Sequence, residues 1–196
     1  METILFLAHT ETDGSLGKPA LEALGAAKSL KAARPGSTLV AGLVGEIVQA
    51  AASRMAGCGA AKFFGVAGAE FAQSRYATDA AAAEALCKAS GATIVIAPGT
   101  SRFARFFAGV AQRVGGRADT HVTAVSVQGD KVAVNRWYYR QRMEAVLQRS
   151  QRPWFILLDP GSQPVWQGEA GSAVVETVAV PLPDSAQRTT VLGLCE

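Results

Sequence analysis

The sequence predicts an α/β fold, in which a doubly wound parallel sheet carries helices on both faces and continues into an antiparallel C-terminal β extension. From residue 4 to residue 113, short apolar runs alternate with alanine-rich stretches of helical period, as in a parallel sheet with crossover helices. After residue 118 the apolar period shortens to that of strands. We therefore expect a single domain over 1–196, with a parallel core over about 1–118, an antiparallel extension over about 119–182 and an exit segment over 183–196.

The core begins with a predicted strand and helix. The run ILFLA over 4–8 is apolar at every position, which is typical of a strand buried on both faces. A polar loop over 9–18 follows. Pro19 suits the first turn of a helix, and the apolar stripe of that helix ends before Arg34. The residues at this spacing are Leu21, Leu24, Ala27, Leu30 and Lys31.

The cycle of strand and helix then repeats. Further strands are expected over 37–45, 61–66 and 93–97, and helices over about 46–56, 78–89 and 101–113. Thr78 is the expected N-cap of its helix, and Asp79 in the first turn would complement the helix dipole.

The antiparallel part holds the remaining predicted strands, over 122–127, 131–139, 144–148 and 153–159. The first two form a hairpin around Gln128, Gly129 and Asp130. Two more strand-like runs lie between Val174 and Val191, but prolines interrupt them, so we expect this stretch to leave the core.

Composition and charge exclude several classes of protein. The 196 residues are 49% hydrophobic and 18% charged, as in a compact soluble domain and not in a disordered chain. Because the net charge is only +3 and no dense basic stripe occurs, we expect no nucleic-acid partner. Cys58, Cys87 and Cys195 lack metal-ligand spacing, and an odd number suits a reducing compartment. The first apolar run is too short for a signal peptide or a membrane span, so we expect a cytoplasmic protein.

The loop over 98–102 is the candidate ligand site. Ligands of parallel sheets bind beyond the carboxyl ends of the strands where the strand order reverses, and the loops after the first and fourth strands usually meet there. Thr100, Ser101 and Arg102, with the free N–H groups of the following helix, would hold an anion. Alternatively, Thr100 and Ser101 only cap that helix. No GxGxxG follows the first strand and no GxxxxGK[ST] occurs, so nucleotide binding lacks its usual phosphate loop.

The sequence contains no recognisable set of catalytic or metal-ligating residues. His9 and His121 are the only histidines, and neither has a partner at ligand or triad spacing. We expect both to be solvated loop side chains, and we assign no catalytic residue and no metal ligand.

The segment over 136–144 is the candidate interaction surface. Arginines at 136, 140 and 142 alternate with aromatic residues, and arginine and tyrosine are enriched in protein interfaces. The candidate contact residues are Trp137, Tyr139, Arg140 and Arg142. The alternative is a solvated edge strand whose charges prevent aggregation.

Several short motifs follow one another in a recognisable order. They are Ser15, Leu16 and Pro19 with Ala26 and Ala27, LVGE over 43–46, GAAK over 59–62, APGTSR over 97–102, Thr120, Val122 and Thr123, Tyr139, and Arg152 with Pro153. In this order they resemble the N-terminal domain of the electron-transfer flavoprotein α subunit across nearly the whole chain. The sequence departs from that family at Phe103, Ala104, Ala108, Gly109, His121, Gln141 and Arg142.

The resemblance implies a Rossmann-like sheet of the adenine nucleotide α-hydrolase type and a role as an electron carrier, not an enzyme. The chain would form a heterodimer with a β subunit and frame an FAD, passing electrons from flavin dehydrogenases of acyl-CoA oxidation to a quinone-linked acceptor. In that family a C-terminal domain holds most of the FAD contacts, and this chain ends about where that domain should begin. We therefore expect FAD in the complete protein but not on this chain alone. The alternative function is a stand-alone protein that binds a small anion or an adenine nucleotide at 98–102.

Overall fold

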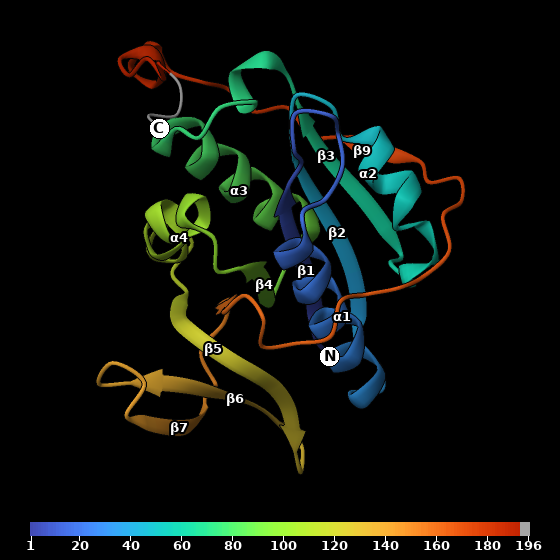
Figure 1. Cartoon of the computed structure of the whole chain (residues 1–196), viewed down its shortest axis with the longest axis vertical. Helices are drawn as coiled ribbons and strands as arrows, with labels where there is room; N and C mark the ends of the chain where they lie inside the picture. Colours follow the sequence, from blue (N-terminus) through green and yellow to red (C-terminus); the bar gives the residue numbers. More distant parts are fainter. Residues whose placement is uncertain (193–196) are drawn as a thin grey trace.

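The computed structural model describes residues 1–192 and contains one sheet of nine strands (Figure 1). The strands are β1 (Thr3–His9), β2 (Thr38–Gly45), β3 (Lys62–Ala67), β4 (Ile94–Pro98), β5 (Arg117–Gln128), β6 (Lys131–Tyr138), β7 (Met143–Gln148), β8 (Trp154–Leu158) and β9 (Val175–Thr177). The α-helices are α1 (Lys18–Ala33), α2 (Gln49–Arg54), α3 (Tyr76–Ser90) and α4 (Ser101–Arg113). Short 3-10 helices span Ala56–Cys58, Ala69–Phe71 and Asp184–Gln187. Among the described residues, no helix is long and apolar enough to cross a membrane.

The sheet is mostly parallel, with antiparallel strands at one edge. The order in space is β7-β6-β5-β8-β4-β1-β2-β3-β9. All neighbours from β5 to β9 in this order pair in parallel, whereas β6 is antiparallel to both β5 and β7. The predicted doubly wound α/β fold with an antiparallel extension is therefore confirmed.

The strand predicted over 153–159 is β8, and the expectation that it belongs to the antiparallel extension is wrong. It lies between β4 and β5 and pairs in parallel with both, so that Trp154 is opposite Ile94 on one side and Arg117 on the other. All five residues of β8 are buried, as expected of a parallel strand that is covered on both faces.

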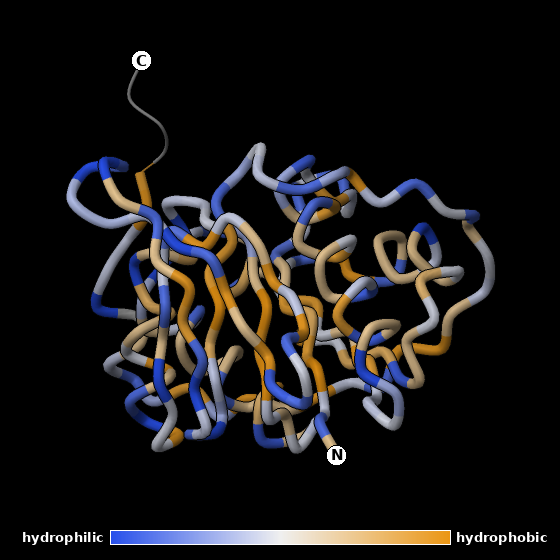
Figure 2. The backbone as a smooth tube through the Cα atoms, turned by 90° about the horizontal axis from the view of Figure 1, so that it is seen from below, coloured by the Kyte–Doolittle hydropathy of each residue, from blue (hydrophilic) through white to orange (hydrophobic). Residues whose placement is uncertain are grey.

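Two layers of helices cover the sheet, because side chains along each buried strand alternate between its faces. In β1, Ile4 and Phe6 pack toward α1 and α2, whereas Leu5 and Leu7 pack toward α3 and α4. Figure 2 shows the hydrophobic stretches gathered in the central strands and the hydrophilic ones in the outer loops.

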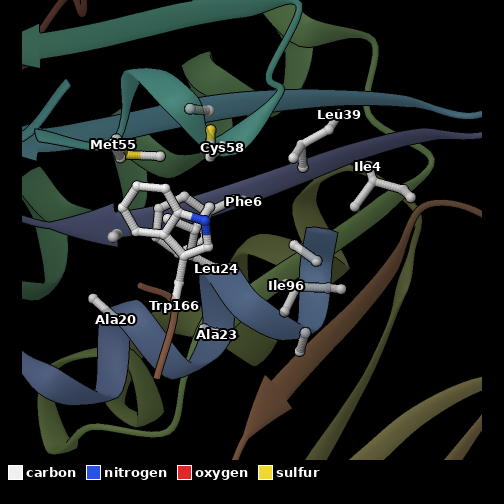
Figure 3. Packing of buried hydrophobic residues seen from close by; sticks show 14 of the residues in the cluster. Ile4, Phe6, Ala20, Ala23, Leu24, Leu39, Met55, Cys58, Ile96 and Trp166 are labelled. Atoms are coloured by element: carbon white, nitrogen blue, oxygen red, sulfur yellow. The ribbon is translucent and has the colours of Figure 1, made fainter. Parts of the chain in front are cut away.

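The stretch after β8 returns to the core, contrary to the expectation that residues from Val174 onward leave it. The buried ring of Trp166 packs with Phe6 and Leu24 on the α1 face (Figure 3). β9 then pairs with β3 at the far edge of the sheet. Farther along, Val178, Val180 and Leu182 pack against the α3 and α4 face, and Ala186 is buried. Cys195 and the end of the predicted exit segment lie outside the described residues.

Candidate functional site

The two loops predicted to meet at the ligand site do meet in the structure. The strand order reverses between β1 and β4, because β2 lies on one side of β1 and β4 on the other. Beyond the carboxyl ends of these two strands lies a cavity of about 220 Å³, which we call the switch-point cavity. It is lined by His9, Thr10, Glu11, Gly17, Pro19, Ala20, Pro98, Thr100, Arg102 and Phe103.

Thr100 and Ser101 stand at the start of α4. The Thr100 hydroxyl accepts a hydrogen bond from the backbone N–H of Phe103 at 3.4 Å, so Thr100 is the N-cap of this helix. Ser101 is exposed and does not line the cavity. The observed role of Thr100 is thus the capping role that the sequence offered as an alternative, while anion binding at this turn stays a prediction.

Arg102 is committed to contacts within the chain. Its guanidinium donates to both carboxylate oxygens of Asp79, at 3.0 and 2.7 Å. It also donates to the backbone carbonyls of Phe71, Ala72 and Gln73, at 2.7, 3.2 and 3.2 Å. An incoming anion would therefore have to compete with Asp79 and with a loop that Arg102 ties to α4.

Asp79 lies in the first turn of α3, as predicted, but its side chain is buried. The helix begins at Tyr76, so the prediction that Thr78 is its N-cap is wrong, and the buried Thr78 hydroxyl donates to the carbonyl of Arg75 at 3.3 Å. Burial opposes ionisation of Asp79, but hydrogen bonds from His9 and Arg102 outweigh it and hold the pKa of the carboxyl below its ordinary value. Asp79 is therefore ionised at neutral pH.

The expectation that His9 is a solvated loop side chain is wrong. Its side chain is only 8% exposed, and Nε2 lies 3.2 Å from Oδ1 of Asp79. The ring contacts Phe103 and Phe106 edge-on, with centroids 4.8 and 5.9 Å away. Burial lowers the pKa of His9 although the bond to Asp79 opposes this, so the ring is neutral at pH 7.

The neutral His9 ring leaves one nitrogen without a partner. We assign the ring proton to Nε2, because the Asp79 carboxylate can only accept a hydrogen bond. Nδ1 is then a buried acceptor with no hydrogen-bond partner among the described residues. The side chain of His121, in contrast, is 64% exposed, as predicted, although the residue lies within β5 and not in a loop. Its Nδ1 lies 3.4 Å from Oδ1 of Asp159.

The predicted interaction residues lie around the turn that joins β6 to β7. Trp137 is half-buried, whereas Tyr139, Arg140 and Arg142 are exposed. All of them except Arg142 border a cavity of about 530 Å³, the turn cavity, lined by His121, Arg136, Trp137, Tyr138, Tyr139, Arg140 and Gln141. Arg136 does not join an exposed basic face, because it bonds to buried Asp119 at 2.9 Å and stacks on Tyr138.

The backbone around the turn cavity is strained. His121, Tyr139, Arg140 and Gln141 have φ angles of 56°, 48°, 56° and 63°, in the left-handed region. Within residues 1–192, no other residue apart from glycines has a positive φ, and all four line the turn cavity. Such strain costs roughly 1–2 kcal/mol per residue and concentrates at binding and switch sites. Gln141 and His121 are also among the positions at which the sequence departs from the family that it resembles.

Metal binding and thiol chemistry have no support in the described part of the chain. No group of three or more histidine, cysteine, aspartate or glutamate side chains is placed there to hold a metal ion. Cys58 and Cys87 are buried free thiols, and burial raises the pKa of Cys87 to about 11. Both thiols are therefore protonated at neutral pH.

One comparison with known proteins gives a match. The family model described as electron transfer flavoprotein domain matches residues 4–183, a range that includes both the switch-point cavity and the turn cavity. No curated protein matches the chain significantly.

Proposed function

The chain belongs to the electron transfer flavoprotein domain family, and from this we propose that it is the N-terminal domain of an α subunit and works as an electron carrier, not as an enzyme. The match over residues 4–183 carries the proposal. The ordered motifs from Ser15 to Arg152 favour the α subunit, and the absence of a legible catalytic set in the sequence agrees with a carrier role.

The switch-point cavity does not fit a complete FAD by itself. The switch-point cavity of about 220 Å³ is smaller than the roughly 300–1,000 Å³ typical of cofactor sites, and Arg102 is already bound to Asp79. No glycine-rich phosphate loop follows β1. We propose that the chain frames an FAD held mainly by a C-terminal flavin domain.

The proposed partners are a β subunit, a flavin dehydrogenase as electron donor and a quinone-linked acceptor. We place the contact with the β subunit at the turn between β6 and β7. Three features support this place: Tyr139 is 74% exposed, Arg140 and Arg142 project unpaired cationic groups within the described chain, and the backbone of the turn is strained. Arginine and tyrosine are also typical anchors of interfaces.

The alternative function, a stand-alone protein that binds a small anion or an adenine nucleotide at 98–102, has weaker support. The N-terminus of α4 and the unpartnered Nδ1 of His9 border the switch-point cavity. However, Arg102 is neutralised by Asp79, and the cavity is small for a nucleotide.

Reconstitution with a β subunit and the α flavin domain tests the proposed function. We expect the three parts together, but not this chain alone, to retain FAD, and the complex to accept electrons from an acyl-CoA dehydrogenase supplied with its substrate. Stoichiometric flavin on the isolated chain would contradict the framing role. A complex that forms but is never reduced would contradict the carrier role.

Two substitutions test the placement of the interface. Tyr139→Ala and Arg140→Ala should each weaken the complex about thirtyfold, because an interface anchor contributes about 2 kcal/mol. Arg54→Ala, which removes an exposed arginine on α2, is the matched control and should leave the affinity unchanged. The affinities are measured by titration calorimetry. Unchanged affinity in both test variants would contradict the interface and favour the alternative, a solvated edge strand whose charges prevent aggregation.

A further inference from the structure

A third cavity, where the tip of the β5–β6 hairpin meets the end of α1, carries four cationic side chains. It is a groove of about 400 Å³, lined by Arg34, Asp130, Lys131, Val132, Gln148, Arg149, Ser150 and Arg152, which we call the basic groove. None of these residues lines the switch-point cavity or the turn cavity. The proposed electron-carrier function uses none of them.

Two of the four cations are held in fixed positions by buried carboxylates. Arg149 donates through Nε and Nη2 to Asp119, which is fully buried. Arg152 donates through Nε and Nη2 to Glu2, at 3.1 and 2.7 Å. Nη1 of Arg152 donates to the backbone carbonyls of Arg149 and Gln151, at 2.6 and 3.1 Å, so Arg152 contributes its charge but no free nitrogen. The fixed guanidinium of Arg149 loses little conformational entropy when its remaining N–H groups bind a ligand. Nη1 of Arg149 has no protein partner among residues 1–192.

The other two cations keep their full charge. Arg34 donates through Nη1 to the backbone carbonyl of Asp130, which joins the end of α1 to the hairpin tip without neutralising the guanidinium. Lys131 follows directly, is exposed, and forms no ion pair within the described part of the chain.

The balance of charge around the groove is positive. Arg136 shares the carboxylate of Asp119 with Arg149, so one buried negative charge serves two guanidinium groups. The lining of the groove itself holds four cations, Arg34, Lys131, Arg149 and Arg152, and one carboxylate, Asp130. The lining is therefore net positive, which favours an anionic ligand.

We propose that the basic groove binds the phosphate group of a small phosphorylated molecule. Arginine forks fit the oxygen geometry of phosphate, and a lysine ammonium adds a point charge. The Ser150 hydroxyl supplies a neutral hydrogen-bond donor in the same groove, whereas the Gln148 amide already donates to Oε1 of Gln128 at 3.2 Å. Val132 is the one apolar residue in the lining, so the chemistry of the groove favours a polar anion over an apolar ligand.

Titration of the full chain with pyrophosphate and with inorganic phosphate tests this site. We expect saturable binding of pyrophosphate by calorimetry at low ionic strength, and weaker binding of phosphate, because pyrophosphate offers more oxygens to the same cations. Lys131→Gln and Arg34→Gln should each weaken pyrophosphate binding about tenfold, since each removes one charge-assisted contact. Lys28→Gln makes the same change of charge at an exposed position of α1 outside the groove and should have no effect.

Several outcomes would overturn the proposal. They are the absence of saturable pyrophosphate binding, an equal loss in the Lys28→Gln variant, or tight binding of a DNA duplex that pyrophosphate does not displace, which would indicate a nucleic-acid surface instead. Unchanged melting temperatures of the two groove variants would show that lost binding reflects the site and not the fold. Because the groove lies apart from the turn cavity, the result does not depend on the reconstitution with a β subunit.

Discussion

Gln141 occupies a backbone conformation that favours glycine. Its φ is 63°, and the two residues before it are also left-handed. Gln141→Gly should raise the free energy of unfolding by about 1 kcal/mol, because glycine removes the clash of Cβ at this φ. Urea denaturation measures the change. Gln148→Gly, within β7, is the control and should lower stability, since glycine weakens a strand that has no such clash. Equal losses in both variants would contradict the strain.

The residues of the switch-point cavity show what sequence reasoning can and cannot predict. The Thr100 cap was predictable, because its partner lies three positions away. The partners of His9 and Arg102 were not, because Asp79 is 70 positions from His9 and 23 from Arg102. A histidine at the end of an apolar run has the same local sequence whether its ring binds a carboxylate from a helix or is exposed to water.

At the level of elements, β9 depends on a glycine in its neighbour β3. A Cβ on Gly65 would lie 2.6 Å from Cγ1 of Val175 and 2.9 Å from Cγ2 of Val48. Both neighbours are β-branched and have little freedom to move. Gly65→Ala should therefore destabilise the protein by about 1–3 kcal/mol and loosen β9. Hydrogen exchange at residues 175–177 measures the loosening.

A double variant checks this cause. Adding Val175→Ala should recover part of the stability lost in Gly65→Ala, although Val175→Ala alone is destabilising, because the two side chains compete for one space. If the losses of stability are strictly additive, the destabilisation by Gly65→Ala has a cause other than the contact with Val175.

The strands themselves were largely predictable, whereas their neighbours in the sheet were not. The run WFILL is apolar at each position, which marks β8 as buried on both faces, but nothing local indicates that it enters between β4 and β5. The short β9 and the buried Trp166 lie in stretches without periodicity. Their positions depend on long-range packing that no pattern of adjacent residues records.

For the molecule as a whole, three buried carboxylates connect separate parts of the fold. Burial opposes ionisation of each, but hydrogen bonds outweigh it and hold each pKa below its ordinary value. The bonds come from Arg152 and Thr93 to Glu2, from His9 and Arg102 to Asp79, and from Arg149 and Trp154 to Asp119.

These shifts predict a loss of stability in acid. As the pH falls below about 4.5, the carboxylates of the unfolded chain take up protons before those of the folded chain. The stabilisation is therefore lost as the pH falls through the lowered pKa values of the folded state. The lowered pKa of His9 adds an earlier loss below about pH 6.5 for the same reason. Unfolding free energies measured from pH 7.5 to pH 3 check both losses. Asp119→Asn should flatten the part of this pH profile below about pH 4.5, and His9→Gln should flatten the part near pH 6. A level profile would contradict the prediction.

The position of β8 also governs how the chain can fold while it is being synthesised. A nascent chain that has reached Ser150 contains every strand from β1 to β7, yet β4 and β5 are not neighbours and each still presents an open edge. Only when residues 154–158 leave the ribosome can the two partial sheets join. Open edges recruit strands from other chains, and contacts that are distant in sequence form slowly. Until β8 is synthesised, the growing polypeptide on a polysome therefore exposes two strand edges that the finished sheet buries.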